Sequence, residues 1–66
     1  MHLTIMQFGK FTVRSYGNGT AYDVQDGPEH FYLQGDDASQ FRDECDSRDW
    51  ITVCDEYMDA MGEIYA

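Results

Sequence analysis

The sequence is poor in basic residues and in cysteine. Its 66 residues include four lysines and arginines against 13 acidic residues, which gives a net charge of −9. That charge repels nucleic acid and anionic lipid, so neither is an expected partner, and a basic protein surface is what it attracts. Two cysteines are too few for the disulfide framework of a secreted miniprotein. We expect free thiols in a reducing cytoplasm, with a single Cys45–Cys54 bridge as the open alternative.

Long apolar runs and a cleavable leader are also missing. No stretch approaches the roughly 20 apolar residues that cross a bilayer. Residues 1–10 lack a basic start, a long apolar run and a small-residue cleavage site, so no export signal is predicted. Hydrophobic residues nevertheless make up 42% of the chain and aromatic residues 15%, too much for a disordered acidic tail. We therefore predict one folded domain, residues 1–66, with a modest core and no deep cleft.

The first half of the chain has the pattern of an antiparallel sheet. Residues 2–8 mix β-branched, apolar and aromatic side chains, and the segments 11–16, 20–25 and 30–34 alternate apolar with polar residues. Turns rich in glycine separate these segments. Alternation in the first segment is imperfect, which implies a bulge or burial of both faces, and one bent strand fits almost as well as two. The inner face of this three- to four-stranded meander is predicted to carry Phe11, Val13, Tyr22, Val24, Phe31 and Leu33.

Residues 36–65 are predicted to be helical, because apolar residues recur there at steps of three and four. Helices over about 38–46 and 50–61 fit this spacing. The sequence thus predicts an α+β fold, an antiparallel meander within residues 2–34 followed by two α-helices packed on one face. The apolar helical face comprises Ala38, Phe41, Cys45, Trp50, Val53, Cys54, Tyr57, Met58, Met61 and Ile64.

The expected helix ends have suitable capping residues. Asp36 or Asp37 is expected to accept a hydrogen bond from a first-turn amide of the first helix. Ser47 or Asp49 is expected to do the same for the second helix, which Gly62 should end.

The polar positions of the helical region are almost all acidic. Ten acidic residues face only two arginines there, so this half carries −8 of the total charge of −9. Glu44–Arg48 is a favourable pair at helical spacing, whereas Asp55/Asp59 and Asp59/Glu63 are repulsive pairs. Solubility alone can explain a solvated acidic face. The ten residues are Asp36, Asp37, Asp43, Glu44, Asp46, Asp49, Asp55, Glu56, Asp59 and Glu63.

A row of carboxylates on a helix can imitate a nucleic-acid strand. Side chains one helical turn apart lie roughly 5–6 Å from each other, near the spacing of successive phosphates. Such a row can occupy a basic groove that normally receives DNA or RNA. The ten acidic residues are therefore candidate partner-binding residues. The expected partner is a basic nucleic-acid-binding protein or complex, bound by a monomer without any cofactor.

The chain resembles the small acidic inhibitors encoded by phages and mobile elements, above all anti-CRISPR proteins that act on type I surveillance complexes. The resemblance rests on length, on the acidic run GDDASQFRDECDSRDW, on Asp55, Glu56 and Asp59, and on the sheet-plus-helix build. It implies a DNA mimic in the cytoplasm of a bacterial host that blocks target DNA binding by a Cascade-like complex. A phage structural or assembly module, held by an apolar patch of methionine and tyrosine without mimicry, is the alternative.

Neither a metal site nor an enzyme is predicted. The acidic segments lack the ligand order of a calcium loop. Zinc needs about four nitrogen or sulfur ligands, and His2, His30 and the two cysteines lack paired spacing. The cysteines fall on apolar helical faces, where a thiol is inert, and Ser15 and Ser39 have no neighbouring base. A small metal-responsive domain stays as a third hypothesis.

Overall fold

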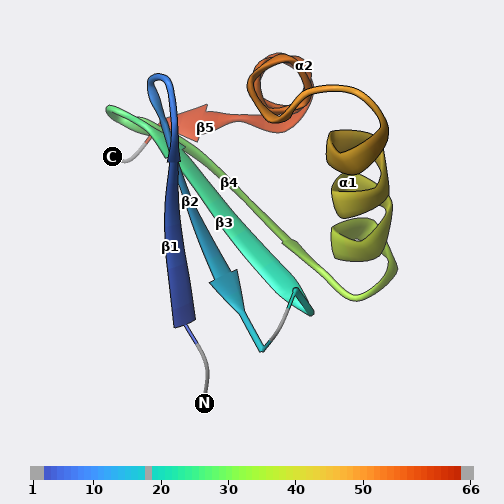
Figure 1. Ribbon diagram of the computed structural model, residues 1–66. Helices are drawn as coiled ribbons and strands as arrows, with labels where there is room; N and C mark the ends of the chain where they lie inside the picture. The colour runs from blue at the N-terminus through green and yellow to red at the C-terminus, as the bar shows by residue number, and fades with distance from the viewer. Residues whose placement is uncertain (1–2, 18, 65–66) are drawn as a thin grey trace.

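The computed structural model describes residues 3–17 and 19–64. Two helices cover one face of an antiparallel sheet whose strands follow one another in chain order (Figure 1). The elements are β1 Leu3–Phe8, β2 Phe11–Tyr16, β3 Ala21–Asp26, β4 Glu29–Gln34, α1 Asp36–Ser47, α2 Trp50–Met61 and β5 Glu63–Ile64. This order confirms the predicted α+β fold of a meander followed by two helices, and adds a short fifth strand.

The four long strands form three hairpins. Phe8 pairs with Phe11, so Gly9 and Lys10 make a two-residue turn in which the glycine has a φ of 58°. A positive φ is a conformation that glycine adopts at little cost. The first two strands are therefore separate rather than one bent strand. The other hairpins lie at the predicted glycine turns, of which Asn18 falls outside the described residues.

The pattern of β1 has a simpler cause than the bulge or two-sided burial that the sequence suggested. Its pairing with β2 is uninterrupted over all six residues. Met6 and Phe8 pack against the core, while Leu3 and Ile5 are exposed. The mixed pattern thus comes from one covered and one open face, and both alternatives were wrong. His2 lies outside the described residues.

The core lies between the inner sheet face and the helices. Every predicted inner-face residue of the sheet is buried. Phe41 of α1 is fully buried, and its ring centroid lies 5.4 Å from that of Tyr22 and 5.0 Å from that of Tyr57. Tilted and edge-to-face contacts of this kind stabilise aromatic clusters. Trp50 at the start of α2 stacks on Phe8 with centroids 4.8 Å apart. Both helices are therefore fixed to the sheet by aromatic contacts.

The second helix ends at Met61 with Gly62 as its C-cap, as predicted, but the apolar spacing was wrong in assigning Ile64 beyond it to the helical face. Gly62 has an extended conformation, with φ of −64° and ψ of 140°, and leads into β5. There Ile64 pairs with Glu29 and is 70% exposed, and Met61 at the end of α2 is 40% exposed. The prediction that these two apolar residues belong to a buried helical face was wrong. The apolar spacing continues past Gly62, where the backbone leaves the helix. Tyr65 lies outside the described residues.

The helix ends agree only in part with the expected caps. Asp49 caps α2, because its Oδ2 accepts hydrogen bonds from Thr52 N at 3.0 Å and Thr52 Oγ1 at 2.9 Å. The start of α1 has no side-chain cap, and its N-cap is a glycine. Asp36 and Asp37 are instead inside the first turn, so their predicted capping role was wrong. Carboxylates in this turn still favour the helix through its dipole.

Candidate functional site

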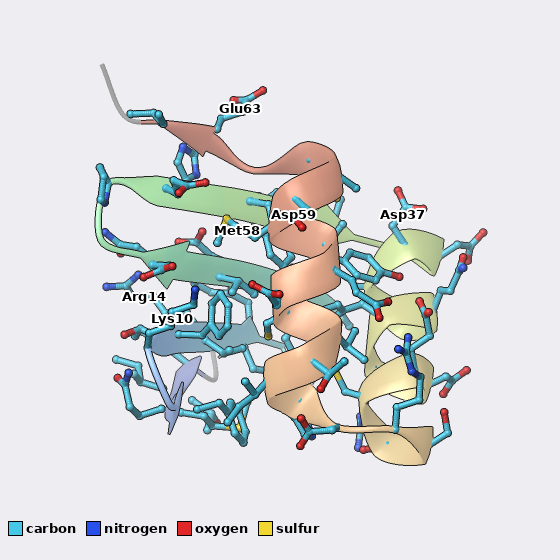
Figure 2. All side chains as sticks on the ribbon, turned by 90° about the horizontal axis from the view of Figure 1, so that it is seen from above. Lys10, Arg14, Asp37, Met58, Asp59 and Glu63 are labelled. Atoms are coloured by element: carbon cyan, nitrogen blue, oxygen red, sulfur yellow. The ribbon has the colours of Figure 1, made fainter. Side chains whose placement is uncertain are left out.

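The ten candidate carboxylates are distributed over the helical layer and its margin. In Figure 2, α1 and α2 run in opposite directions, with Asp37 on α1, Asp59 on α2 and Glu63 on β5. Because Glu63 belongs to a strand, the expected helical pair of Asp59 with Glu63 does not exist. The acidic residues occupy a hollow beside α1, the seam between the helices, and the outer side of α2 with β5. They do not form one continuous helical row.

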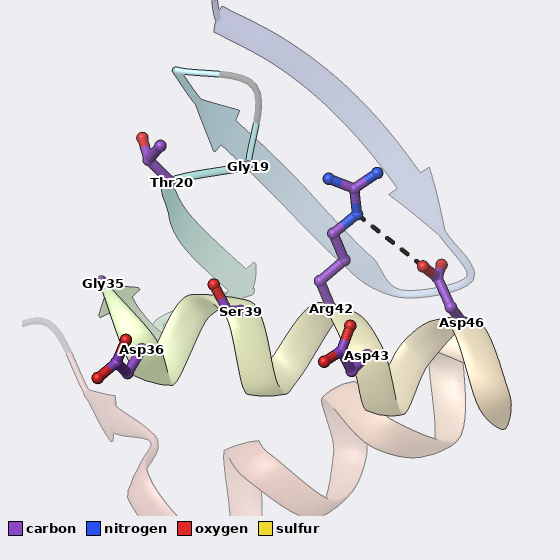
Figure 3. A pocket seen from close by; sticks show the side chains of 8 residues that line it. All are labelled: Gly19, Thr20, Gly35, Asp36, Ser39, Arg42, Asp43 and Asp46. Atoms are coloured by element: carbon purple, nitrogen blue, oxygen red, sulfur yellow. Dashed lines mark ion pairs between the residues drawn. The ribbon is translucent and has the colours of Figure 1, made fainter.

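A hollow of about 700 Å³ lies between α1 and the turn that connects β2 with β3 (Figure 3). In it, Arg42 Nε lies 3.9 Å from Asp46 Oδ2, one helical turn away. Asp36 and Asp43 are exposed, and their side chains form no hydrogen bond or ion pair within the described part of the chain. One arginine therefore faces three carboxylates here. The lining residues are Gly19, Thr20, Gly35, Asp36, Ser39, Arg42, Asp43 and Asp46.

The seam between the helices holds carboxylates that have internal partners. Arg48 donates two hydrogen bonds to Glu56, at 2.8 and 2.5 Å. This bidentate contact lowers the pKa of Glu56 from its ordinary value, mainly through hydrogen bonding. The predicted Glu44–Arg48 pair is not formed, because Arg48 lies beyond the end of α1 and reaches α2 instead. Glu44 accepts a hydrogen bond from the Tyr57 hydroxyl.

Tyr57 connects the aromatic core to this acidic seam. Its pKa is raised to about 12, first by burial, then by the hydrogen bond to Glu44, with further contributions from the nearby charges of Glu44 and Asp37. The phenol therefore stays protonated as a donor at neutral pH. The side chain of Asp37 itself forms no hydrogen bond or ion pair within residues 3–17 and 19–64. Glu44 and Asp37 of α1 thus place negative charge close to Tyr57 of α2.

The outer side of α2 carries one paired and one unpaired aspartate. Lys10 Nζ from the β1–β2 turn lies 3.8 Å from Asp55 Oδ1 and 3.6 Å from Asp26 Oδ2. Asp59 is exposed in the last turn of α2, where no basic residue is present. A helix C-terminus carries partial negative charge, which disfavours a carboxylate there. Asp59 therefore occupies a position that costs stability, and Asp55 four residues earlier adds repulsion.

The two thiols offer little chemistry. Cys45 and Cys54 are free and buried. Burial is the main cause that raises the pKa of each to about 12, so both stay protonated at neutral pH. Because the thiolate is the reactive form, neither thiol is an effective nucleophile. Among the residues that the structure describes, no group of three or more His, Cys, Asp or Glu side chains is arranged to hold a metal ion.

Two features of the surface were missed by the sequence reasoning. One is the set of internal partners, Lys10, Arg48 and Tyr57, which come from distant parts of the chain. The other is the open face of β1, with Leu3 and Ile5 exposed. The shared parity of these two residues in the strand was the available signal, because it separates them from Met6 and Phe8.

Together these features define a small α+β domain with an acidic helical layer over a sheet whose net charge is close to zero. No protein-family model, curated protein or solved structure matches the chain. Neither helix in the described part is long and apolar enough to span a membrane.

Proposed function

We propose that this protein binds a basic, nucleic-acid-receiving surface of a partner protein by presenting carboxylates in place of phosphates. The observation that carries the proposal is a set of exposed carboxylates that form no hydrogen bond or ion pair within the described chain. The other five candidates have structural partners and contribute to the surrounding field. The carboxylates without partners are Asp36, Asp37, Asp43, Asp59 and Glu63.

The placement of the charge supports binding over solubility alone. Solubility depends on net charge and is indifferent to where the charge lies. In this chain −8 of −9 lies after Gly35, and Asp59 is placed at the unfavourable end of a helix. A lysine at that position would stabilise the fold. The carboxylates in this half of the domain repel one another. A partner surface with positive charge would offset that repulsion, which accounts for their concentration in one half.

In the form that the resemblance favours, the partner is a type I, Cascade-like CRISPR-Cas complex in the cytoplasm of a bacterial host. The protein acts there as an acidic inhibitor without catalysis. It occupies the surface that reads or admits target DNA, and so competes with DNA. No cofactor takes part in this function.

The first experiment captures partners from a low-salt bacterial lysate on the immobilised protein. The affinity of the purified partner is then measured, both for this protein and for the nucleic acid that the partner binds. We expect the affinity to fall steeply between about 50 and 200 mM salt and the nucleic acid to compete for binding. The variant Asp43→Asn/Asp59→Asn should bind weakly. The control Tyr32→Lys/Gln34→Lys makes the same change in net charge on the open sheet face and should bind as the wild type. Affinity that is independent of salt contradicts the proposal.

A second candidate is an assembly module of a phage particle or complex that binds through apolar contacts. The exposure of Met61 at 40%, Tyr32 at 51% and Ile64 at 70% favours it. In that case Asp43→Asn/Asp59→Asn should keep full binding. Met61→Lys/Ile64→Lys should then abolish it, so the two variants separate the two functions.

A further inference from the structure

Within residues 3–17 and 19–64, one edge of the sheet has none of the usual protection against pairing with another strand. β1 lies at the end of the strand order and pairs only with β2. Its six residues, LTIMQF, include no proline and no charged residue, and its register contains no bulge. Leu3 is 51% exposed and Ile5 is 60% exposed. Natural sheets normally protect such edges with charges, proline, bulges or a covering segment.

The opposite edge is protected over part of its length. β5 pairs there with the first two residues of β4, His30 with Glu63 and Glu29 with Ile64. β5 is two residues long and places Glu63 at the margin. A short, charged edge is a poor template for a further strand. Residues 31–34 of β4 have no strand partner on the side of β5 among the described residues, so this edge is partly open, and β1 is the edge that is open along its whole length.

The backbone groups available at the open edge follow from the register. Phe8 and Phe11 flank a two-residue turn, so they form a hydrogen-bonded pair. Hydrogen-bonded and non-bonded pairs alternate along an antiparallel ladder. Leu3, Ile5 and Gln7 therefore direct their N–H and C=O groups away from β2, toward the open edge.

We propose that β1 pairs antiparallel with β1 of a second copy of this chain, which joins the two sheets into one. Ile5 lies on the two-fold axis opposite Ile5 of the other copy, and Leu3 lies opposite Gln7. This register pairs all the outward backbone groups and brings Leu3 and Ile5 of both copies into one apolar stripe. The same edge serves both copies, so the assembly closes at a dimer. Head-to-tail growth would need the edge of β4, where β5 and its Glu63 interrupt pairing.

The distribution of charge favours contact between two copies through this edge. β1 has no ionisable side chain, and residues 1–35, which include the four long strands, carry only −1 of the total −9. Arg14 lies opposite Ile5 in the register, and its Nη1 lies 3.6 Å from Asp23 Oδ2, so this pair adds no net charge beside the seam. Two copies that meet through their helical layers would bring together two surfaces that each carry a net charge of −8. Contact through β1 therefore avoids the strongest repulsion between two identical chains.

The size of the contact sets its strength. One pair of six-residue strands gives an interface at or below the low end of the range for specific complexes, about 1,200 Å². We expect a monomer–dimer equilibrium that responds to protein concentration. The monomer expected from the sequence is then the dilute state. Salt should favour the dimer, because it screens the repulsion between two chains of charge −9.

The test is sedimentation velocity of the whole chain from micromolar to millimolar concentration. The mass should rise from 7.6 kDa toward twice that value. Ile5→Lys and Leu3→Lys should each remain at the monomer mass, and circular dichroism should show both to be folded. Ile64→Lys makes the same change at a more exposed residue on the opposite edge and should dimerise like the wild type. Amide exchange of Ile5 should slow as the wild type dimerises.

Three results would overturn the proposal. They are a wild type that keeps the monomer mass at every concentration, assemblies that grow beyond the dimer, and loss of the dimer in Ile64→Lys but not in Ile5→Lys. Opposite responses to salt separate this interface from the proposed partner-binding surface. Failure of either one leaves the other intact.

Discussion

At the scale of the residue, Tyr57 shows what periodicity can and cannot predict. Its spacing from Val53 and Cys54 correctly assigned its ring to the inner side of α2, where it contacts Phe41. The hydroxyl reaches Glu44, thirteen residues earlier in the chain. That contact depends on how two helices cross, which no local pattern specifies. The sequence therefore predicted the position of the Tyr57 ring and missed the hydrogen bond of its hydroxyl.

Replacing Tyr57 by phenylalanine should remove the hydrogen bond and keep the ring contacts. We expect the free energy of unfolding to fall by about 1 kcal/mol at neutral pH, since the bond is charge-assisted but only partly buried. Because the folded state raises the pKa of Tyr57 from 10.0 to about 12, its contribution is complete below pH 10 and is lost as the pH rises toward 12. Urea denaturation across this range should show the difference between wild type and Tyr57→Phe disappearing. Tyr32→Phe, at an exposed site, is the control, and a difference independent of pH would contradict the assignment.

At the scale of the element, the hairpins were predictable and β5 was not. Gly9-Lys10 between two apolar segments is a local turn signal, and the structure confirms it. Met61 and Ile64 continue the helical spacing of α2, so the apolar pattern assigned both to its buried face, although Gly62 was expected to end the helix and does so. The deciding interaction is the pairing of β5 with β4, which are far apart in the chain. Tertiary pairing here overrides a local pattern.

Gly62→Ala tests how the chain enters β5. A Cβ at this position would lie 2.5 Å from the Met58 carbonyl oxygen and 2.7 Å from the Met58 sulfur. Backbone oxygen cannot yield as a flexible side chain can, so the turn must open. We expect a loss of about 1–3 kcal/mol in the free energy of unfolding, measured with urea, as for other overpacked sites. Amide exchange at residues 29–30 of β4 should accelerate.

Gln40→Ala is the matched control for Gly62→Ala, because it changes an exposed position in the middle of α1. Alanine favours a helix slightly more than glutamine, so stability should stay the same or rise a little. Equal stability of the Gly62→Ala variant and the wild type would show that the close approach to Met58 does not limit this turn.

At the scale of the whole molecule, the sequence predicted where the charge lies and missed how much of it is compensated. The division into a nearly neutral sheet and an acidic helical layer follows directly from counting residues. Asp55 and Asp59 have equivalent helical positions one turn apart, yet only Asp55 has an ion-pair partner, Lys10, from the β1–β2 turn. Such partners belong to distant elements and become known only with the fold. The candidate surface could therefore be assigned as a region but not residue by residue.

This difference between Asp55 and Asp59 gives a test of whether the acidic layer is kept for binding. Asp59→Lys places a cation at the C-terminal end of α2 and removes the repulsion with Asp55, so the free energy of unfolding should rise by about 0.3–1 kcal/mol. Asp55→Lys places a lysine beside Lys10 and breaks its ion pair, so it should give no such gain. Thermal and urea denaturation at low salt measure both, and added salt should reduce the difference. If Asp59→Lys gains stability and loses affinity for the basic partner, the native aspartate lowers the stability of the fold while it serves binding. A stabilised variant that keeps full affinity would assign Asp59 to solubility alone and would leave Asp36, Asp37, Asp43 and Glu63 as the carboxylates that replace phosphate.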